Sequence, residues 1–279
     1  MWSEIDLKAR IHEIRVHIGD PAIARATIAD LSTLSADPHK DGLMGWLQDG
    51  IDMDDRRYEI RTALRCLSRV LAPRAYLEIG TRRGWSLAQV LRETPECVAV
   101  SCDMWVTDYA DAPNPGPSFV LEELARVIGS TSGITFLSGN SHDVLPVLFE
   151  TVTADPAVPS TVDAARLVRT VPPRFDLVTV DGDHSALGAW WDLCDVMPRV
   201  ALGGVVVFDD LIDWSDELLG SRPTSRYPAL HQRPALAHSL LELWHRAEET
   251  FNDFHFETAP GFPEGAPPVG FAMRMREPR

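Results

Sequence analysis

From residue 75 onward, short apolar runs alternate with segments of helical periodicity, and this alternation constrains the fold more than any other feature. The expected strands are residues 75–79, 98–101, 134–137, 175–180 and 204–208, followed by 253–257 and 269–274. The expected helices are residues 86–92, 119–128, 142–149, 187–196 and 234–250. Strands that alternate with helices form a parallel sheet covered on both faces, and continuous Val-rich runs fit strands buried on both sides. We therefore expect an α/β, Rossmann-like sheet of seven strands, mostly parallel, with a terminal antiparallel pair.

Before residue 75, apolar residues at helical spacing predict a helical extension. Ile11, Ile14 and Ile18 recur three and four residues apart. Pro21 fits the first turn of a second helix over 22–34. Residues 37–54 are rich in Asp and Gly, which predicts a mobile loop with a short turn at 43–47. The predicted division is thus a helical extension or lid over 1–55 and one main domain over 56–279.

Two later stretches interrupt the alternation of strands and helices. A Pro-rich loop is expected over 107–117, and a long connection over 151–173 with a short helix at 162–168. Connections of this length in a compact domain are usually either functional or disordered. The aromatic residues near these loops, Trp46, Trp105 and Tyr109, are expected to serve either in a lid or in the core. Arg82 and Arg83 are expected to be surface charges, with binding of a phosphate group of a ligand as the alternative.

The composition excludes several classes of protein. The chain has 26 Lys and Arg residues against 41 Asp and Glu residues, a net charge of −15, which disfavours binding to nucleic acid. No apolar stretch approaches the roughly 20 residues that cross a membrane. The four cysteines form no CxxC pair, and the polar start lacks the pattern of a signal peptide, so we expect a cytoplasmic protein. The sequence does not decide whether the protein is a homo-oligomer.

The first strand runs into a glycine-rich turn that is typical of nucleotide-binding sites. The turn contains Gly80, Thr81 and Gly84 and leads into a helix near Ser86, whose free N–H groups could face a ligand. A dinucleotide fingerprint would begin with glycine, but Glu78 stands at that position. Its carboxylate would repel a pyrophosphate and suits a ligand with a nearby positive charge, such as an ammonium or a sulfonium.

Polar residues that follow the second and third strands extend this predicted site. Asp103 lies 23 residues after Gly80, the distance at which an acidic residue binds ribose hydroxyls in nucleoside-binding sheets. Asn140 is placed to face an adenine edge, and Ser141 is expected mainly to cap the next helix. Together with the glycine turn, these residues predict a nucleoside at the carboxyl ends of the strands.

Acidic residues also gather after the fourth and fifth strands. The fourth strand ends in Asp181-Gly182-Asp183-His184-Ser185, and the fifth is followed by Asp209 and Asp210. Carboxylates that converge at one sheet edge repel one another and raise their pKa values. A divalent cation resolves this conflict, and oxygen ligands favour Mg²⁺, with Mn²⁺ or Ca²⁺ as alternatives. His184 is placed to take up a proton.

With these motifs, the sequence over about 56–275 resembles class I S-adenosylmethionine-dependent methyltransferases. It is most similar to the metal-dependent O-methyltransferase group that includes macrocin and mycinamicin sugar O-methyltransferases, and more distantly to catechol O-methyltransferase. The resemblance implies that Asp181, Asp209 and Asp210 hold Mg²⁺ and that His184 is the general base. It also implies the cofactor contacts, which are Glu78, Gly80, Thr81, Gly84, Ser86, Asp103, Asn140 and Ser141. The implied acceptor is a hydroxyl of a sugar or a glycosylated natural product.

Three other functions are weighed against this one. A nicotinamide-dependent oxidoreductase is disfavoured by Glu78 and by the lack of a Tyr-x-x-x-Lys pair. A non-catalytic nucleoside-binding protein is disfavoured by the complete set of acidic residues with His184. A catechol-like acceptor is disfavoured because residues 181–193 contain no lysine that could act as the base.

Overall fold

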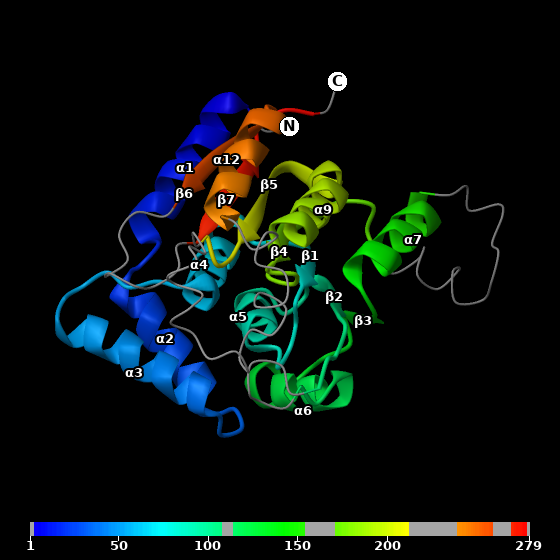
Figure 1. The fold of residues 1–279 in the computed structure, drawn as a ribbon. Coiled ribbons are helices and arrows are strands. Elements are labelled where there is room, and N and C mark those ends of the chain that lie inside the picture. The colour runs from blue at the N-terminus through cyan, green and yellow to red at the C-terminus, as the bar shows by residue number, and fades with distance from the viewer. Residues whose placement is uncertain (1–2, 108–113, 154–170, 212–238, 259–268, 278–279) are drawn as a thin grey trace.

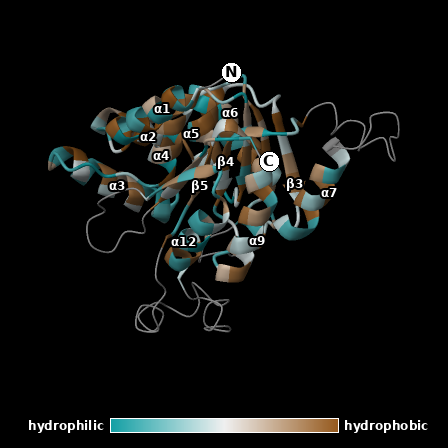
Figure 2. Ribbon diagram, turned by 90° about the horizontal axis from the view of Figure 1, so that it is seen from above, coloured by the Kyte–Doolittle hydropathy of each residue, from teal (hydrophilic) through white to brown (hydrophobic). Residues whose placement is uncertain are grey.

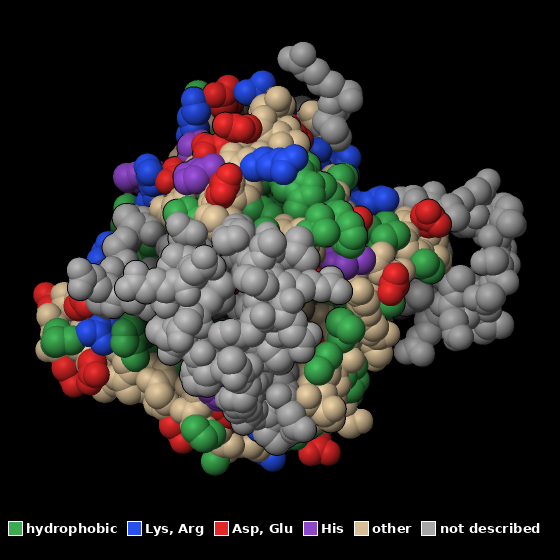
Figure 3. All heavy atoms as spheres, viewed as in Figure 1, with side chains coloured by type: hydrophobic (Ala, Val, Ile, Leu, Met, Phe, Trp, Pro, Cys, Tyr) green, Lys and Arg blue, Asp and Glu red, His purple; other side chains and the backbone are tan. Residues whose placement is uncertain are grey.

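The computed structural model describes residues 3–107, 114–153, 171–211, 239–258 and 269–277 (Figure 1). Tyr109 and the short helix expected at 162–168 lie outside these residues. Within them, no helix is long and apolar enough to cross a bilayer. On the face shown in Figure 3, the described Lys and Arg side chains lie among Asp and Glu side chains and form no broad basic field.

Seven strands form one sheet in the order β3-β2-β1-β4-β5-β7-β6. Their bounds are β1 (Ala75–Ile79), β2 (Val98–Asp103), β3 (Ile134–Ser138), β4 (Phe175–Val180), β5 (Val200–Phe208), β6 (Phe254–Thr258) and β7 (Gly270–Arg274). Strands β1 to β5 are parallel, whereas β7 is antiparallel to both β5 and β6. The predicted fold class is therefore confirmed.

Helices cover both faces of the sheet, as Figure 2 shows from above. On one side lie α1 (Glu4–His17), α2 (Pro21–Ser32), α3 (Pro38–Asp52), α4 (Ile60–Leu71), α5 (Trp85–Glu93) and α6 (Pro117–Ile128). On the other lie α7 (Ser141–Thr153), α9 (Ala186–Val196) and α12 (Leu240–Thr250). Neighbouring strand residues face opposite layers: Leu177 packs in the first apolar cluster and Val178 in the second. The Val-rich strands β4 and β5 are thus largely buried on both faces, as their sequences predict.

The loop expected over 37–54 is wrong, because the 15-residue helix α3 occupies this segment. The Asp37 carboxylate accepts hydrogen bonds from the backbone N–H groups of His39 (2.9 Å) and Lys40 (3.3 Å), and Pro38 fits the first turn. Gly50 packs so closely on Arg57 that an added Cβ would lie 2.6 Å from its Cδ atom. The Asp-Gly pairs indicate turns locally, but the N-cap and this contact decide in favour of the helix.

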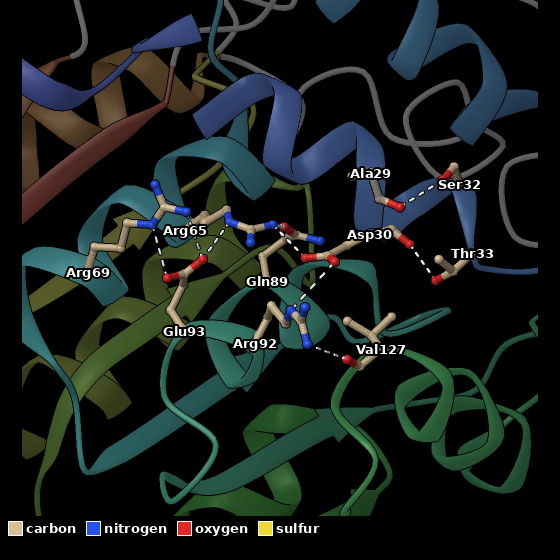
Figure 4. Close-up of polar contacts among 10 residues, drawn as sticks. All are labelled: Ala29, Asp30, Ser32, Thr33, Arg65, Arg69, Gln89, Arg92, Glu93 and Val127. Carbon is tan, nitrogen blue, oxygen red and sulfur yellow. Dashed lines mark hydrogen bonds and ion pairs between the residues drawn. The ribbon is translucent and has the colours of Figure 1, made fainter. Parts of the chain in front are cut away.

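Ion pairs centred on the buried Arg65 and on Asp30 attach the N-terminal helices to the rest of the molecule (Figure 4). Asp30 of α2 lies 2.6 Å from Arg65 of α4 and 3.6 Å from Arg92 of α5. Glu93 of α5 lies 2.7 Å from the same Arg65. Leu7 and Leu31 also share an apolar cluster with Leu64. The first helices therefore pack on α4 and α5, while a division of the chain after residue 55 stays a prediction.

The expectation that Arg83 is a surface charge is also wrong. Its side chain is buried, with Nε 3.4 Å from the Asp37 carboxylate and the guanidinium 4.7 Å from the centre of the Phe119 ring. This contact joins the glycine turn after β1 to the start of α3. The pairing lies 46 residues back along the chain, so no local pattern indicates it.

Candidate functional site

The candidate site lies where the carboxyl ends of the central strands meet. Hydrogen bonds between strands continue one residue beyond each strand, from the N–H of Gly80 to Cys102 O, of Asp181 to Ile79 O, and of Asp209 to Val180 O. Gly80 has a φ of +90°, and an added Cβ would lie 1.8 Å from the Asp181 carbonyl oxygen. The glycine turn and the acidic segment after β4 are therefore in direct backbone contact.

Glu78 lies beneath the glycine turn, where it is completely buried. Its carboxylate accepts hydrogen bonds from the hydroxyl groups of Ser86 (2.5 Å), Tyr76 (3.1 Å) and Ser101 (3.4 Å). Burial raises the pKa of Glu78 to about 7, although the three hydroxyl groups oppose this shift. The Thr81 hydroxyl is also buried and hydrogen-bonds to that of Ser101. These side chains thus support the turn from below and do not face open solvent.

Gly84 has a structural reason to be glycine. It has a φ of +75° at the start of α5, and an added Cβ would lie 2.5 Å from a methyl group of Val120 in α6. The sequence suggests a close ligand approach at this position. The described contact is instead the packing of α6 against the turn.

We expect Glu78 to make the free energy of unfolding depend on pH. Because burial raises its pKa from 4.5 to about 7, the folded protein binds this proton more tightly than the unfolded chain. Stability should therefore fall as pH rises from about 5 to 8, by on the order of 3 kcal/mol from this group. The variant Glu78→Gln should flatten this fall in denaturant titrations of the chelator-treated protein.

The matched control for this prediction is Glu122→Gln, because Glu122 is exposed on α6. Its stability should follow the wild-type dependence on pH. Parallel curves for wild type and Glu78→Gln would contradict the assignment of this proton to Glu78.

Three donors converge on the carboxylate of Asp103 at the end of β2. They are the backbone N–H groups of Arg82 (2.7 Å) and Trp105 (2.5 Å) and the side-chain amide of Asn114 (3.3 Å). Arg82 and Trp105 have φ values of +49° and +55°, which are strained for residues other than glycine. Strain of this kind concentrates at functional sites. The three donors therefore fix the position of the Asp103 carboxylate. Asn114 is a residue of the site that the sequence did not predict.

After β3, the residue that caps the next helix differs from the one expected. The Asn140 side chain accepts a hydrogen bond from the backbone N–H of His142 (3.1 Å), so Asn140 caps α7 in place of Ser141. Ser141 is instead the first residue of α7 and is buried. Burial raises the pKa of nearby Asp192 to about 6, and both the Ser141 hydroxyl and His142 oppose this shift.

His184 bridges two of the acidic residues. Its Nε2 atom lies 3.3 Å from Asp181 Oδ1, and its Nδ1 atom lies 3.2 Å from Asp210 Oδ2. One ligand atom from each of these three residues lies within 4.8 Å of the others, a spacing that could hold a metal ion. All three are partly exposed, so an ion could reach them. The residues present therefore fit a cation.

Asp209 is not among the three residues of this group. Burial, together with the charges of Asp210 and Asp181, raises its pKa well above the ordinary value. The structure thus brings Asp181 and Asp210 together with His184, whereas the predicted ligand set contains Asp209 instead of His184. The identity of the ligands stays a prediction. Asp183 is exposed and accepts a hydrogen bond from the N–H of Ser185 (2.8 Å).

Arg61 is a further residue that the sequence reasoning missed. It lies at the start of α4, 2.5 Å from Glu59 and 5.6 Å from the centre of the Trp85 ring. Burial lowers the pKa of Arg61, but attraction to Glu59, Asp209 and Asp181 outweighs burial and raises it. Arg61 therefore supplies positive charge near the acidic residues. It lies too far from them in the sequence for a local motif to indicate this.

Comparison with known proteins places this site in a methyltransferase domain. Residues 77–211, just under half of the chain, match the family model described as a methyltransferase domain. These residues run from β1 to the segment after β5, and include Asp103, Asp181 and His184. No curated protein matches the sequence.

Several solved structures are similar to this chain. The O-methyltransferase TomG from Streptomyces achromogenes, involved in tomaymycin synthesis and solved with SAM, is 18% identical, with 87% of this chain and 92% of that chain covered and a TM-score of 0.47. The methyltransferase PaMTH1 from Podospora anserina, bound to SAH, is 14% identical, with coverages of 90% and 87% and a TM-score of 0.48. An O-methyltransferase from Bacillus cereus in complex with SAH is 14% identical, with coverages of 75% and 77% and a TM-score of 0.46. These likenesses are too distant to indicate an acceptor.

The match over residues 77–211 agrees with the predicted class of methyltransferase, and the seven-stranded sheet with its antiparallel pair is the predicted fold.

Proposed function

We propose that this protein is an S-adenosylmethionine-dependent methyltransferase that transfers the methyl group to a hydroxyl oxygen of a small molecule, a sugar or a glycosylated natural product, with the help of Mg²⁺ or Mn²⁺. The observation that carries the proposal is the group of Asp181, His184 and Asp210 at the same sheet edge as the glycine turn. Direct contact between Gly80 and the Asp181 backbone sets the two halves of the site side by side. Methyl donor and acceptor would therefore meet at this edge.

The cofactor half of the site consists of residues after the first three strands. Asp103 would bind the ribose hydroxyls, and Asn140 with Ser141 would face the adenine. Gly80, Thr81, Gly84 and Ser86 would shape the turn around the amino-acid part. The buried Glu78 would favour a positive charge near the turn by its own negative charge. When bound, S-adenosylmethionine supplies an activated methyl group.

The acceptor half would hold the cation and move the proton. Asp181 and Asp210, with Asp209 in the predicted set, would bind the ion, which when bound lowers the pKa of an acceptor hydroxyl. His184 would be the general base: its Nε2 lies 3.3 Å from Asp181 Oδ1 and its Nδ1 lies 3.2 Å from Asp210 Oδ2, so the two carboxylates would stabilise the ring once it has taken up the proton. The arrangement positions two reactants for an in-line displacement, and positioning supplies much of the acceleration.

The choice of a sugar over a catechol-like acceptor is supported by the histidine of the acidic segment. Residues 181–193 contain no lysine, so His184 is the one basic side chain of this segment. A cytoplasmic location and a role in the biosynthesis of natural products are part of the same proposal.

Calorimetric titration tests the cofactor half of this proposal. We expect S-adenosylhomocysteine to bind with a Kd in the micromolar range, and NAD to bind at least about 100-fold more weakly because the buried Glu78 opposes a pyrophosphate. Tight binding of NAD without binding of S-adenosylhomocysteine would contradict the proposal. Product analysis with simple glycosides and catechols, in the presence of Mg²⁺, then distinguishes the acceptor classes.

A further inference from the structure

The side-chain amide of Asn114 contacts Asp103 through its NH₂ group, and its oxygen atom accepts no hydrogen bond from the described residues. Its Nδ2 atom is 3.3 Å from Asp103 Oδ1, and the residue is 8% exposed. A carboxylate accepts but does not donate hydrogen bonds, so the NH₂ group must face Asp103, and this fixes the orientation of the amide. The Oδ1 atom of Asn114 is buried, and within the described part of the chain it accepts no hydrogen bond.

A buried carbonyl oxygen without a donor is uncommon in a folded protein. The other orphaned side-chain oxygens include the hydroxyl groups of Thr27 and Ser68, which lie within helices packed in the interior. Asn114 differs because it stands at the sheet edge, beside a carboxylate that already gathers two backbone N–H groups. Asp103 Oδ1 already accepts two hydrogen bonds, whereas Oδ2 accepts one and keeps a lone pair for a ligand. The Asn114 amide contacts the same carboxylate, so its oxygen is a second acceptor in the same region.

A vicinal diol matches this pair of acceptors. The two ribose hydroxyls of a nucleoside are neighbouring donors, and two acceptors side by side can bind both at once. We propose that Asn114 binds the ribose of the cofactor together with Asp103, its Oδ1 accepting a hydrogen bond from one ribose hydroxyl. This inference rests on the proposed function, in which Asp103 binds the ribose.

Asn114 would therefore have two roles that separate experimentally. Its NH₂ group orients the Asp103 carboxylate, which is a structural role. Its Oδ1 atom binds one specific hydroxyl, which a structural role would not require. Only the second role makes the effect of Asn114 depend on whether that hydroxyl is present in the ligand.

The test uses S-adenosylhomocysteine and its 2′-deoxy and 3′-deoxy analogues as probes in calorimetric titrations. The variant Asn114→Ala should bind S-adenosylhomocysteine about 5- to 10-fold more weakly than wild type, the effect of one hydrogen bond. For one of the two deoxy analogues, wild type and Asn114→Ala should bind equally, because the partner hydroxyl is already gone. The control Asn252→Ala, at an exposed position before β6, should bind all three probes as wild type does.

Thermal unfolding followed by circular dichroism shows whether each variant is folded. If Asn114→Ala does not fold, Asn114→Gln keeps the amide and displaces its oxygen, and the same dependence on one hydroxyl is expected. Equal binding of S-adenosylhomocysteine by the folded variant and wild type would overturn the inference, as would losses of the same size for all three probes. If wild type itself does not bind S-adenosylhomocysteine, the proposed function fails, and this inference fails with it.

Discussion

The variant Gly80→Ala should lose at least about 4 kcal/mol of the free energy of unfolding. The added Cβ would lie 1.8 Å from the carbonyl oxygen and 2.5 Å from the carbonyl carbon of Asp181, both of which are backbone atoms held in the sheet. No rotamer change relieves such a clash, so β1 and β4 would have to separate at their carboxyl ends. Since the stability of a whole domain is about 5–15 kcal/mol, partial or complete unfolding is expected. Urea titration followed by circular dichroism measures the loss.

Gly129→Ala is the matched control for this prediction. Gly129 has a φ of +77°, similar to the +90° of Gly80, but an added Cβ there would meet no atom within 4 Å. The control therefore carries the backbone strain without the clash, and it should cost about 1–2 kcal/mol. The difference between the two variants measures the contact of the glycine turn with the acidic segment. Equal losses in both would contradict that contact.

The sheet could be predicted from the sequence because its strands carry local signals. Residues 75–79 and 175–180 are mostly apolar, are bounded by polar or Pro-containing segments, and form β1 and β4 within the predicted limits. The helix α3 could not be predicted in this way, since the Asp-Gly pairs in it are typical of turns. Its N-cap is local, but the packing of Gly50 on Arg57 is tertiary and outweighs the turn signals.

The position of the candidate site could be predicted from the sequence, but its hydrogen bonds and ion pairs could not. Residues that follow parallel strands must meet at one edge, so Gly80, Asp103 and Asp181 come together as expected. The contacts of Arg61 and Asn114 depend on how α4 and the segment before α6 return to that edge, and neither has a sequence motif. The complete burial of Glu78 could not be predicted either, because its three hydroxyl partners come from two strands and a helix that meet only in the folded protein.

The variant Asp181→Ala should lose the response of the enzyme to a divalent cation. In the proposed function, Asp181 contributes a ligand atom beside Asp210, and its loss should lower the rate of methyl transfer by at least about 100-fold. Chelation of the wild-type enzyme with EDTA should abolish activity, and Mg²⁺ should restore it. A second measurement needs no activity: at 100 times its Kd, a bound cation stabilises the folded protein by about 2.7 kcal/mol, which a thermal shift detects. Asp181→Ala should show no such shift with Mg²⁺ or Mn²⁺.

Two variants in the same segment separate cation binding from the other roles. Asp183→Asn changes an exposed carboxylate two residues away, so it should keep both the thermal shift and the activity. His184→Ala should lower turnover far more than the affinity for S-adenosylhomocysteine, because His184 is proposed to take the acceptor proton. If His184→Ala also abolishes the cation-dependent thermal shift, His184 is a ligand, as its distances to Asp181 and Asp210 allow. Full activity of wild type after thorough chelation would remove the cation from the reaction and leave His184, between its two carboxylates, as the base alone.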